Sequence, residues 1–346
     1  MPPRGRGPKD VGDCVNVKAQ TKRFFVWDAY WDTARLQSFD LEGKPGAISA
    51  LGQYWASVAQ SLPQGASVLD LGCGHGAASL ALLAAGSKAT ITAIDEANID
   101  PVRYLPEKAA QLSRITFRPR VQMEELPFED MSFDAVVSQF GIEFGPLPKT
   151  ATEIARVLKP GGFMAALVLP YNSEAVQEAR IALKQCRYLL TEAKLFETAI
   201  TMLQAYHQAP PDVQEPQMQA ALDQFRKTVE DAFAKFSEKE INVLSVIVNA
   251  LYQVFGNRKT ATEQDQIFAI ESARTHLAHY AARAQDTARS AVDINMTALR
   301  GALVAAGIQL SDARPMQAQG YKGLVAYQLF GRKLAKPPQQ QPAAGA

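Results

Sequence analysis

The stretch VLDLGCGHG, residues 68–76, determines the fold class that we predict for this chain. Its first part is a short apolar run typical of a buried strand, and a helical pattern follows over residues 75–86. The glycines between them let backbone N–H groups approach a ligand, and the start of the helix favours a negatively charged group. This segment therefore predicts a strand, a tight ligand-binding turn and a helix.

The alternation of strands and helices continues after this stretch. Further strand patterns stand at residues 89–95, 115–122, 133–140 and 163–170, and helical patterns stand at 101–112 and 149–158. Such alternation predicts right-handed crossovers and a mostly parallel sheet with helices on both faces. A helix over 293–306 and two closing antiparallel strands over 314–319 and 323–332 complete the prediction. We therefore expect a doubly wound α/β fold with a seven-stranded sheet.

Differences in composition and pattern divide the chain into segments. Residues 65–172 and 293–333 form the predicted α/β core, and the aromatic and apolar residues of 24–64 stand at helical spacing and predict a lid. Residues 173–292 carry no convincing strand pattern and are predicted to form a helical insertion after the fifth strand. The flanking segments are predicted to be flexible tails, the first of them basic; they are residues 1–23 and 334–346.

The composition is that of a globular protein and argues against several classes. The 346 residues include 36 Lys and Arg against 35 Asp and Glu, so the net charge of +1 gives no attraction for nucleic acids or anionic membranes. The apolar-rich run at 241–255 is too short and interrupted for stable membrane insertion, and the N-terminus lacks the apolar segment of a secretory signal. The three cysteines form no CxxC motif, which argues against a metal site. We expect a cytoplasmic protein without a metal.

Two acidic residues mark the predicted binding edge of the sheet. Asp70 precedes the first glycine of the turn, where a carboxylate would repel a pyrophosphate but could accept a hydrogen bond from a cationic amine. Asp95 ends the second predicted strand, where a carboxylate can accept both hydroxyls of a ribose, and Glu96 could share that role. The glycine spacing with Ala77 also fits the fingerprint of nicotinamide-dependent enzymes, so a dinucleotide stays an alternative.

Four segments together resemble the class I S-adenosylmethionine-dependent methyltransferases. They are VLDLGCGHG, TAIDEAN (92–98), VQMEELPFEDMSFDAVVSQFGIEF (121–144) and EIARVLKPGGFMAALVLP (153–170). Their order and spacing match the family over residues 65–170, and the small-molecule group that includes ubiquinone and menaquinone C-methyltransferases is the most similar. The resemblance implies a Rossmann-like fold, S-adenosylmethionine as cofactor and methyl transfer as the activity.

The resemblance also implies cofactor-binding roles by position. Asp70 and the turn after it would hold the methionine part of the cofactor, and Asp95 would bind the ribose. Residues 122–124 would flank the adenine, although this chain has Gln122 where relatives commonly have Asp. The residues implied in cofactor binding are Asp70, Gly72, Cys73, Gly74, Asp95, Glu96, Gln122, Met123, Glu124, Ser138 and Gln139.

Methyl transfer from a sulfonium requires an in-line nucleophile about 3 Å away and needs a base only where the acceptor must lose a proton. Glu143 and Tyr171 follow the fourth and fifth predicted strands and are the candidate catalytic residues. Three histidines of the insertion are further alternatives: His207, His276 and His279. The candidate substrate and lid contacts are Tyr30, Trp31, Arg35 and Phe140, although the lid residues also fit the packing of an amphipathic helix.

The insertion is the segment that we expect to set substrate specificity. Additions after the fifth strand commonly cap the acceptor pocket in this fold class, and the apolar residues 241–255 could line a pocket for an apolar or aromatic acceptor. The same residues also fit the insertion's own core or a homodimer interface. We predict methyl transfer to a small organic molecule under a helical cap. The alternatives are a cofactor-binding scaffold or regulatory subunit without catalysis and a nicotinamide-dependent oxidoreductase.

Overall fold

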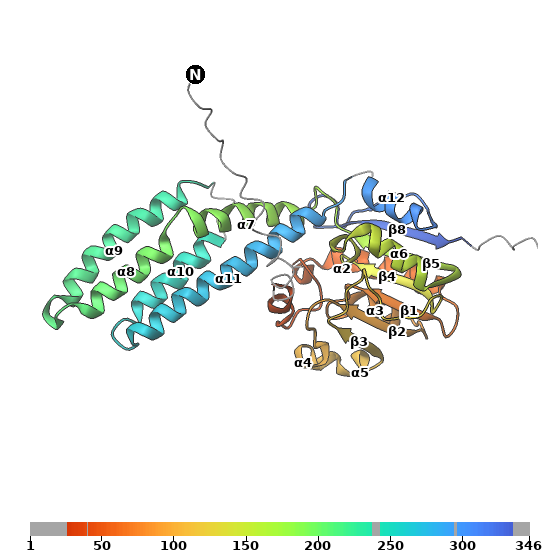
Figure 1. The fold of residues 1–346 in the computed structure, drawn as a ribbon, viewed down its shortest axis with the longest axis horizontal. Coiled ribbons are helices and arrows are strands. Elements are labelled where there is room, and N and C mark those ends of the chain that lie inside the picture. Colours follow the sequence, from red (N-terminus) through yellow and green to blue (C-terminus); the bar gives the residue numbers. More distant parts are fainter. Residues whose placement is uncertain (1–25, 40, 237–242, 294–295, 335–346) are drawn as a thin grey trace, which may run out of the picture.

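The computed structural model describes residues 26–39, 41–236, 243–293 and 296–334. An α/β core and an elongated bundle of helices lie next to each other, and the bundle extends to one side of the sheet (Figure 1). The two predicted tails lie outside the described residues, apart from Leu334.

The core is built on one mixed sheet of eight strands. The strand order is β3-β2-β1-β4-β5-β8-β6, and β7 also pairs with β8. Strands β1 to β5 run parallel to their neighbours, and β8 runs antiparallel to β5. The prediction of a doubly wound, mostly parallel sheet is confirmed. The strands are β1 (Ser67–Leu71), β2 (Thr90–Asp95), β3 (Ile115–Pro119), β4 (Phe133–Gln139), β5 (Leu158–Val168), β6 (Ile308–Leu310), β7 (Arg314–Met316) and β8 (Ala326–Lys333).

Two details of the sheet differ from the prediction. The sheet has eight strands instead of seven, because β6 follows the last helix and pairs antiparallel with β8. A strand of three residues is too short to show an alternating pattern. Strand β5 begins at Leu158 rather than at Phe163, because the Lys-Pro-Gly-Gly turn is part of the strand and the register to β4 shifts between Phe133 and Ala135.

Helices cover both faces of the sheet, as the side-chain alternation of each strand requires. In β1, Val68 belongs to an apolar core that it shares with α2 (Pro45–Ser61) and α3 (Ala77–Ala84). Leu69, on the opposite face, belongs to a second core shared with α6 (Leu147–Val157) and α12 (Thr297–Ala305). A strand that is covered on both faces reads as a continuous apolar run, and residues 67–72 were recognisable for that reason.

Short helical elements complete the core. Residues 26–31 form a helical segment, and η1 (Leu41–Gly43) precedes α2. The broken helix that was predicted over 101–112 consists of α4 (Pro101–Tyr104), η2 (Pro106–Lys108) and α5 (Ala109–Leu112). Proline lacks the amide hydrogen that would continue the helix at Pro106. After β4 a single turn, η3 (Ile142–Phe144), leads to α6.

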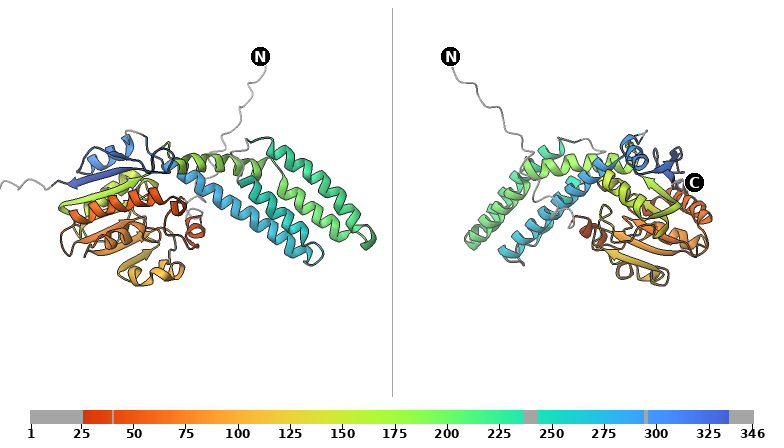
Figure 2. Two further views of the ribbon diagram at one scale, coloured as in Figure 1. Left: turned by 180° about the vertical axis from the view of Figure 1, so that it is seen from behind. Right: turned by 45° about the vertical axis from the view of Figure 1, so that its right-hand side comes forward.

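Five long helices form the insertion between β5 and α12. They share an apolar core that is separate from the two cores of the sheet. Figure 2 shows from two directions that α7 and α11 join this bundle to the α/β core. In the described part of the chain, no helix is both long and apolar enough to cross a bilayer. The five helices are α7 (Glu174–Thr191), α8 (Leu195–Gln208), α9 (Pro211–Phe233), α10 (Val243–Gly256) and α11 (Glu263–Ser290).

The apolar residues predicted as a lining for an acceptor pocket lie elsewhere. Helix α10 buries Leu244, Ile247 and Leu251 in the insertion's own core. Helices α7 and α11, rather than α10, reach the α/β core. Of the alternatives that the sequence left open for 241–255, packing within the insertion's own core is the one that the described residues of this helix show.

Candidate active site

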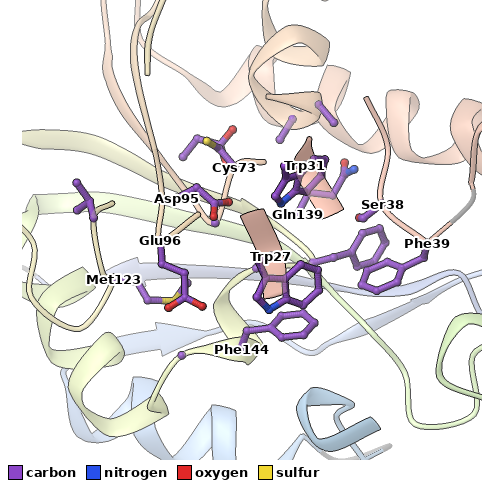
Figure 3. Close-up of a pocket in the computed structure, with 18 of the residues that line it drawn as sticks. Trp27, Trp31, Ser38, Phe39, Cys73, Asp95, Glu96, Met123, Gln139 and Phe144 are labelled. Carbon is purple, nitrogen blue, oxygen red and sulfur yellow. The ribbon is translucent and has the colours of Figure 1, made fainter. Parts of the chain in front are cut away.

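A cavity lies at the carboxyl ends of β1, β2 and β4, where the strand order reverses between β1 and β4. In open α/β sheets this reversal point is where ligands bind. Residues 26–39, which we call the covering segment, lie over the cavity, and Figure 3 shows their side chains next to the sheet residues. The wall is formed by Trp27, Trp31, Leu36, Ser38, Phe39, Asp70, Gly72, Cys73, Ala77, Ala78, Asp95, Glu96, Val121, Met123, Glu124, Gln139, Phe140, Gly141, Phe144 and Gly145.

Two glycines shape the turn after β1. Gly72 and Gly74 have φ angles of +61° and +50°, a left-handed backbone that costs other residues about 1–2 kcal/mol. A Cβ atom at Gly72 would lie 2.9 Å from the Cα of Gly141, and one at Gly74 would overlap the indole ring of Trp31. The thiol of Cys73 between them is buried, and burial raises its pKa well above the usual range. Cys73 is thus an inert part of the wall.

Asp70 is a buried acid with one oxygen that lacks a partner. Its Oδ2 accepts a hydrogen bond from the Oγ of Ser79 at 2.6 Å, while its Oδ1 has no hydrogen-bond partner among the described residues. Burial raises the pKa of Asp70 to about 7. Leaving a buried polar atom unsatisfied costs about 1–3 kcal/mol. A cationic amine in the cavity would satisfy Oδ1 and favour the ionised carboxylate.

Two backbone amides hold Asp95 at the end of β2. Its Oδ2 accepts from the amide of Gly74 at 2.8 Å, and its Oδ1 accepts from the amide of Ala97 at 2.9 Å. Burial outweighs these bonds and raises the pKa of Asp95. A carboxylate has about four acceptor positions, so Asp95 can accept two further hydroxyl groups. Glu96 also lines the cavity, and Figure 3 shows both acids on the side of Met123.

The segment after β3 contributes an apolar surface. Val121, Met123 and Glu124 line the cavity, whereas Gln122 is not part of the wall that the described residues form. The amide of Val121 donates to the carbonyl of Asp95 at 3.0 Å and brings this segment to the end of β2. The Cε of Met123 reaches the glycine turn, 3.5 Å from the Cβ position of Gly72. An adenine at this place would meet the thioether of Met123 and not the Gln122 amide.

Ser138 joins the ends of β1 and β4 instead of lining the cavity. Its Oγ donates to the carbonyl of Leu71 at 2.8 Å and accepts from the amide of Ile142 at 2.9 Å. The side chain is buried, and its two hydrogen bonds hold the strand ends together next to the cavity. Phe140, two residues later, does line the cavity and has a left-handed φ of +55°.

Gln139 connects the cavity wall to two neighbouring elements. Its Oε1 accepts from the indole Nε1 of Trp55 in α2 at 2.6 Å, and its Nε2 donates to the Oε1 of Gln37 in the covering segment at 2.9 Å. These two bonds fix the orientation of the amide. Gln139 thereby couples the position of the covering segment to the end of β4.

Aromatic rings narrow the cavity from the covering segment. Trp27 meets Phe144 edge to face with ring centroids 5.2 Å apart (Figure 3). Phe39 meets Phe140 in the same way at 5.8 Å. The remaining space is about 60 Å³, well below the ~300 Å³ of a pocket that encloses a small molecule. The covering segment therefore narrows the cavity, and we expect it to move when a ligand of nucleoside size binds.

Polar contacts at the surface hold the covering segment in this position. Asp28 pairs with Arg120 at 2.6 Å and accepts from the amide of Asn98 at 2.7 Å. Asp32 accepts from the hydroxyl of Tyr104 at 2.8 Å. Ion pairs at exposed positions contribute about 0.2–1 kcal/mol each, so contacts of this kind can be broken and remade as the segment moves.

Several predicted residues lie outside this cavity. Tyr30 and Arg35 line a neighbouring cavity between the covering segment and helices α7 and α11. Gly74 is covered by Trp31 rather than open to the cavity. The insertion histidines His207, His276 and His279 are also outside the wall, and the Nε2 of His207 lies 2.8 Å from the side-chain Oε1 of Gln266.

The two candidate bases do not reach the cavity. The carboxyl of Glu143 is buried; its Oε1 accepts from the amide of Leu169 at 2.9 Å, and its Oε2 has no hydrogen-bond partner in the described chain. Burial raises the pKa of Glu143 to about 7. The ring of Tyr171 is 57% exposed and packs on the guanidinium of Arg180 at 3.7 Å. In this arrangement neither residue can contact a substrate in the cavity.

Sequence reasoning missed three aromatic wall residues, Trp27, Phe39 and Phe144. The spacing of Trp27 and Trp31 by one helical turn was a usable signal, since residues four apart lie on one helix face. Phe39 and Phe144 carry no such signal, because their ring contacts join parts of the chain that are distant in sequence.

A family model described as a methyltransferase domain matches residues 68–162. These residues include β1, the glycine turn, β2 and β4, and the matched range as a whole supplies most of the residues of the cavity wall. The chain carries a class I S-adenosylmethionine-dependent methyltransferase domain. The match confirms the predicted family, an enzyme domain, and S-adenosylmethionine as the cofactor of that domain.

Curated relatives of the methyltransferase domain carry different substrate names. A fatty-acid O-methyltransferase of Mycolicibacterium smegmatis is 33% identical over 111 residues, which are 32% of this chain and 39% of that protein. A demethylmenaquinone methyltransferase of Clavibacter sepedonicus is 33% identical over 36% of this chain and 58% of its own. A dimethylglycine N-methyltransferase of Parasynechococcus marenigrum is 38% identical over 30% of this chain and 38% of its own. The chain thus spans about two fifths to three fifths of these relatives.

Several solved structures are also similar to parts of this chain. The [4+2]-cyclase SpnF is 27% identical over 34% of this chain and 47% of its own, with a TM-score of 0.30. A SAM-dependent methyltransferase of Methanosarcina mazei is 16% identical over 81% of this chain and 98% of its own, with a TM-score of 0.39.

The cavity residues fit S-adenosylmethionine. The buried Oδ1 of Asp70 lacks a partner and is an acceptor for a cationic amine, which the methionine part of the cofactor carries. Asp95 and Glu96 provide the carboxylates that a ribose requires, at the strand end where such groups are found in nucleotide-binding α/β folds. Met123 offers an apolar face for an aromatic base.

Proposed function

We propose that this protein transfers a methyl group from S-adenosylmethionine to a small organic acceptor. When bound, the cofactor supplies a methyl group on a positively charged sulfur, which needs no further activation. The observation that carries this proposal is the unsatisfied Oδ1 of Asp70, buried within a methyltransferase domain and close to the carboxylate of Asp95. A cavity for a plain apolar ligand would have no use for such an acceptor.

We assign the cofactor contacts on the basis of the cavity wall. Asp70 would bind the amine, the turn with Gly72 and Cys73 would follow the methionine chain, and Asp95 with Glu96 would accept the ribose hydroxyls. Met123 would pack against the adenine, with Val121 and Glu124 beside it. Gln139 and Phe140 lie at the end of β4, on the side from which an acceptor would approach.

The acceptor would enter between the covering segment and the insertion. The aromatic wall of Trp27, Phe39, Phe140 and Phe144 suits an apolar or aromatic acceptor. Helices α7 and α11 contribute to the neighbouring cavity, which supports the insertion as a cap over the acceptor. The protein's own contribution would be positioning and exclusion of water, because Glu143 and Tyr171 stand outside the wall.

The test is calorimetric titration of the full chain with S-adenosylmethionine, S-adenosylhomocysteine and NAD. We expect micromolar binding of both sulfur nucleosides and none of NAD. Asp70→Asn and Asp95→Ala should each weaken binding at least tenfold (about 1.4 kcal/mol), whereas Asp312→Ala, at an exposed position, should change nothing. Binding of NAD in place of the sulfur nucleosides would instead support a nicotinamide oxidoreductase.

Binding alone does not distinguish an enzyme from a cofactor-binding scaffold. Glu143 and Tyr171 lie outside the cavity, so neither could take a proton from an acceptor there. For acceptors that must lose a proton to a protein base, this placement favours the cofactor-binding scaffold. Turnover with acceptors that need no base, such as preformed carboxylates, thiolates and tertiary amines, is the discriminating measurement. A cytoplasmic location and a homodimer through the insertion stay predictions from the sequence.

A further inference from the structure

The imidazole ring of His75 packs against two aromatic rings beside the candidate active site. His75 belongs to the turn after β1, and its side chain is fully buried. Its ring centroid lies 5.0 Å from that of Trp31 in the covering segment, and 5.7 Å from that of Tyr104 in α4, on which it stacks. Among the described residues, His75 is not part of the wall of the candidate active site. Any role that it has in the reaction therefore acts through other residues.

One hydrogen bond ties this ring to the covering segment. The Nδ1 of His75 lies 2.8 Å from the backbone carbonyl oxygen of Arg35. A carbonyl oxygen only accepts, so Nδ1 carries the hydrogen and donates it. The other ring nitrogen, Nε2, is buried and has no hydrogen-bond partner among the described residues. Burial also lowers the pKa of His75 below its usual value, so the ring is neutral at pH 7 with its hydrogen on Nδ1.

Packing alone does not explain a histidine at this position. A buried polar atom without a partner costs more free energy than one hydrogen bond typically contributes, so the imidazole gives no net gain in stability. A phenylalanine ring would also pack against Trp31 and Tyr104, and it has no nitrogen that lacks a partner. The property that phenylalanine lacks is the Nδ1 donor, which points to a use for the bond with Arg35.

The bond reaches the part of the covering segment that lines the candidate active site. Arg35 directly precedes Leu36, and Ser38 and Phe39 follow; these three residues form part of the cavity wall. His75 directly follows the glycine turn, which forms another part of the same wall. The hydrogen bond therefore joins two parts of the wall, and we expect a cofactor in the cavity to contact both.

We propose that His75 is a positioning residue, which holds the covering segment over bound S-adenosylmethionine through its Nδ1 donor. This proposal rests on the proposed methyl transfer. A covering segment that is held in place excludes water from the reacting groups and slows release of the cofactor. The unpartnered Nε2 has the opposite effect, because it can bind water once the segment has moved, which makes opening less costly. His75 thus both closes the site and keeps the closure reversible.

Two substitutions of His75 separate the donor from the ring. His75→Asn keeps a side-chain N–H that can donate to the carbonyl of Arg35, whereas His75→Phe keeps an aromatic ring without a donor. In the full chain without cofactor, hydrogen exchange over residues 26–39 should be unchanged in His75→Asn. In His75→Phe it should be about two- to tenfold faster, the range expected for loss of one hydrogen bond.

Two controls show whether the effect is confined to the covering segment. Exchange over residues 67–71 of β1 should be unchanged in both variants, because the core of the sheet does not depend on the donor. Ser311→Ala also removes a side-chain donor to a backbone carbonyl, that of Phe330, and should not change exchange over residues 26–39. Equal acceleration over both segments in His75→Phe would mean that His75 has a structural role only, and would overturn the proposal.

Release of the cofactor product gives the second measurement. S-adenosylhomocysteine should dissociate from His75→Phe about two- to tenfold faster than from the parent, and from His75→Asn at the parent's rate. Equal rates for all three proteins, or equal acceleration in both variants, would contradict the proposal. Failure of the proposed function has a separate signature, because neither sulfur nucleoside would then bind to the parent. Hydrogen exchange without cofactor still tests the hold on the covering segment in that case.

Discussion

The indole ring of Trp31 lies directly on Gly74, so that a Cβ atom at residue 74 would overlap three atoms of the ring. Trp31 belongs to the covering segment, and Gly74 belongs to the turn that follows β1. Residue 74 thus has two reasons to be glycine: its φ of +50° and its contact with the segment that closes the cavity. The position of the covering segment and the shape of the turn after β1 therefore both depend on the contact between Trp31 and Gly74.

Substituting Gly74 should destabilise the protein by more than backbone strain alone. Gly86 also has a positive φ, +87°, but a Cβ atom there would meet open space. We expect Gly86→Ala to lower the free energy of unfolding by about 1–2 kcal/mol and Gly74→Ala to lower it by a further ~1–3 kcal/mol, the usual range for overpacking. Urea denaturation of the two variants measures the difference.

A double variant separates the two causes. In a Trp31→Ala background the ring is gone, so Gly74→Ala should cost only what Gly86→Ala costs. If the cost of Gly74→Ala is the same with and without Trp31, the contact between ring and turn does not contribute, and strain at residue 74 explains the whole effect.

Binding of S-adenosylhomocysteine should depend on pH through Asp70. Because burial raises the pKa of Asp70 to about 7, the acid is neutral in mildly acidic solution and ionised above that value. A cationic amine binds the ionised form, so affinity should rise, by up to about tenfold per pH unit, as the pH increases from about 5.5 to about 7.5. Calorimetry at several pH values measures this slope, and Asp70→Asn should remove it. A slope that survives in Asp70→Asn would assign the titration to another group.

The core of the fold could be predicted because its strands lie between two layers of helices. β1, β2, β4 and β5 read as apolar runs for this reason, and Gly, Pro and charged residues separate them. The strand β6 and the start of β5 could not be predicted. The position of β6 depends on its pairing with β8, and the start of β5 depends on its pairing with β4. A local sequence pattern does not indicate which distant strand will pair with it.

The candidate site could be predicted where a residue is tied to a strand end. Asp70 and Asp95 occupy such positions, and both line the cavity. The resemblance implied Gln122, at a position where relatives commonly have Asp. The segment after β3 is irregular, so its side chains do not alternate regularly, and the neighbouring Val121 and Met123 line the cavity instead. The neighbouring cavity lined by Tyr30 and Arg35 could not be predicted, because it depends on helices α7 and α11 of the insertion lying against the covering segment.

Release of the covering segment should accelerate exchange of the cofactor. Asp28→Asn removes the ion pair with Arg120 but retains an oxygen that can accept from the amide of Asn98. Loss of an exposed pair of about 0.5–1 kcal/mol corresponds to a two- to five-fold faster dissociation of S-adenosylhomocysteine. Stopped-flow fluorescence of Trp27 and Trp31, which line the cavity, follows the reaction.

Salt and a matched pair provide the controls for this experiment. High salt, about 1 M, screens surface ion pairs, so the difference between Asp28→Asn and the parent should disappear there. Asp223→Asn removes an exposed pair outside the cavity wall, that with Arg226 in α9, and should leave the dissociation rate unchanged. Equal effects of both substitutions would mean that the ion pair at Asp28 does not hold the covering segment.

Glu143 should lower the stability of the protein as the pH rises. Burial raises its pKa from the usual value of 4.5 to about 7 in the folded state. Between these values the folded chain binds more protons than the unfolded chain, so the free energy of unfolding falls with increasing pH, and the full cost is present above about pH 7. For a pKa shift of this size, the free energy of unfolding falls by up to about 3 kcal/mol.

Glu143→Gln isolates this contribution, because glutamine keeps the oxygen that accepts from Leu169 and cannot ionise. The variant should be close to the parent in stability near pH 5 and more stable near pH 8, as measured by urea denaturation at both values. Asp70 titrates in the same direction, but it is present in both proteins and cancels in the difference. Parallel stability curves would mean that the Glu143 carboxyl ionises at its ordinary pKa and reaches water. The buried acid beside the cavity would then again be a candidate base.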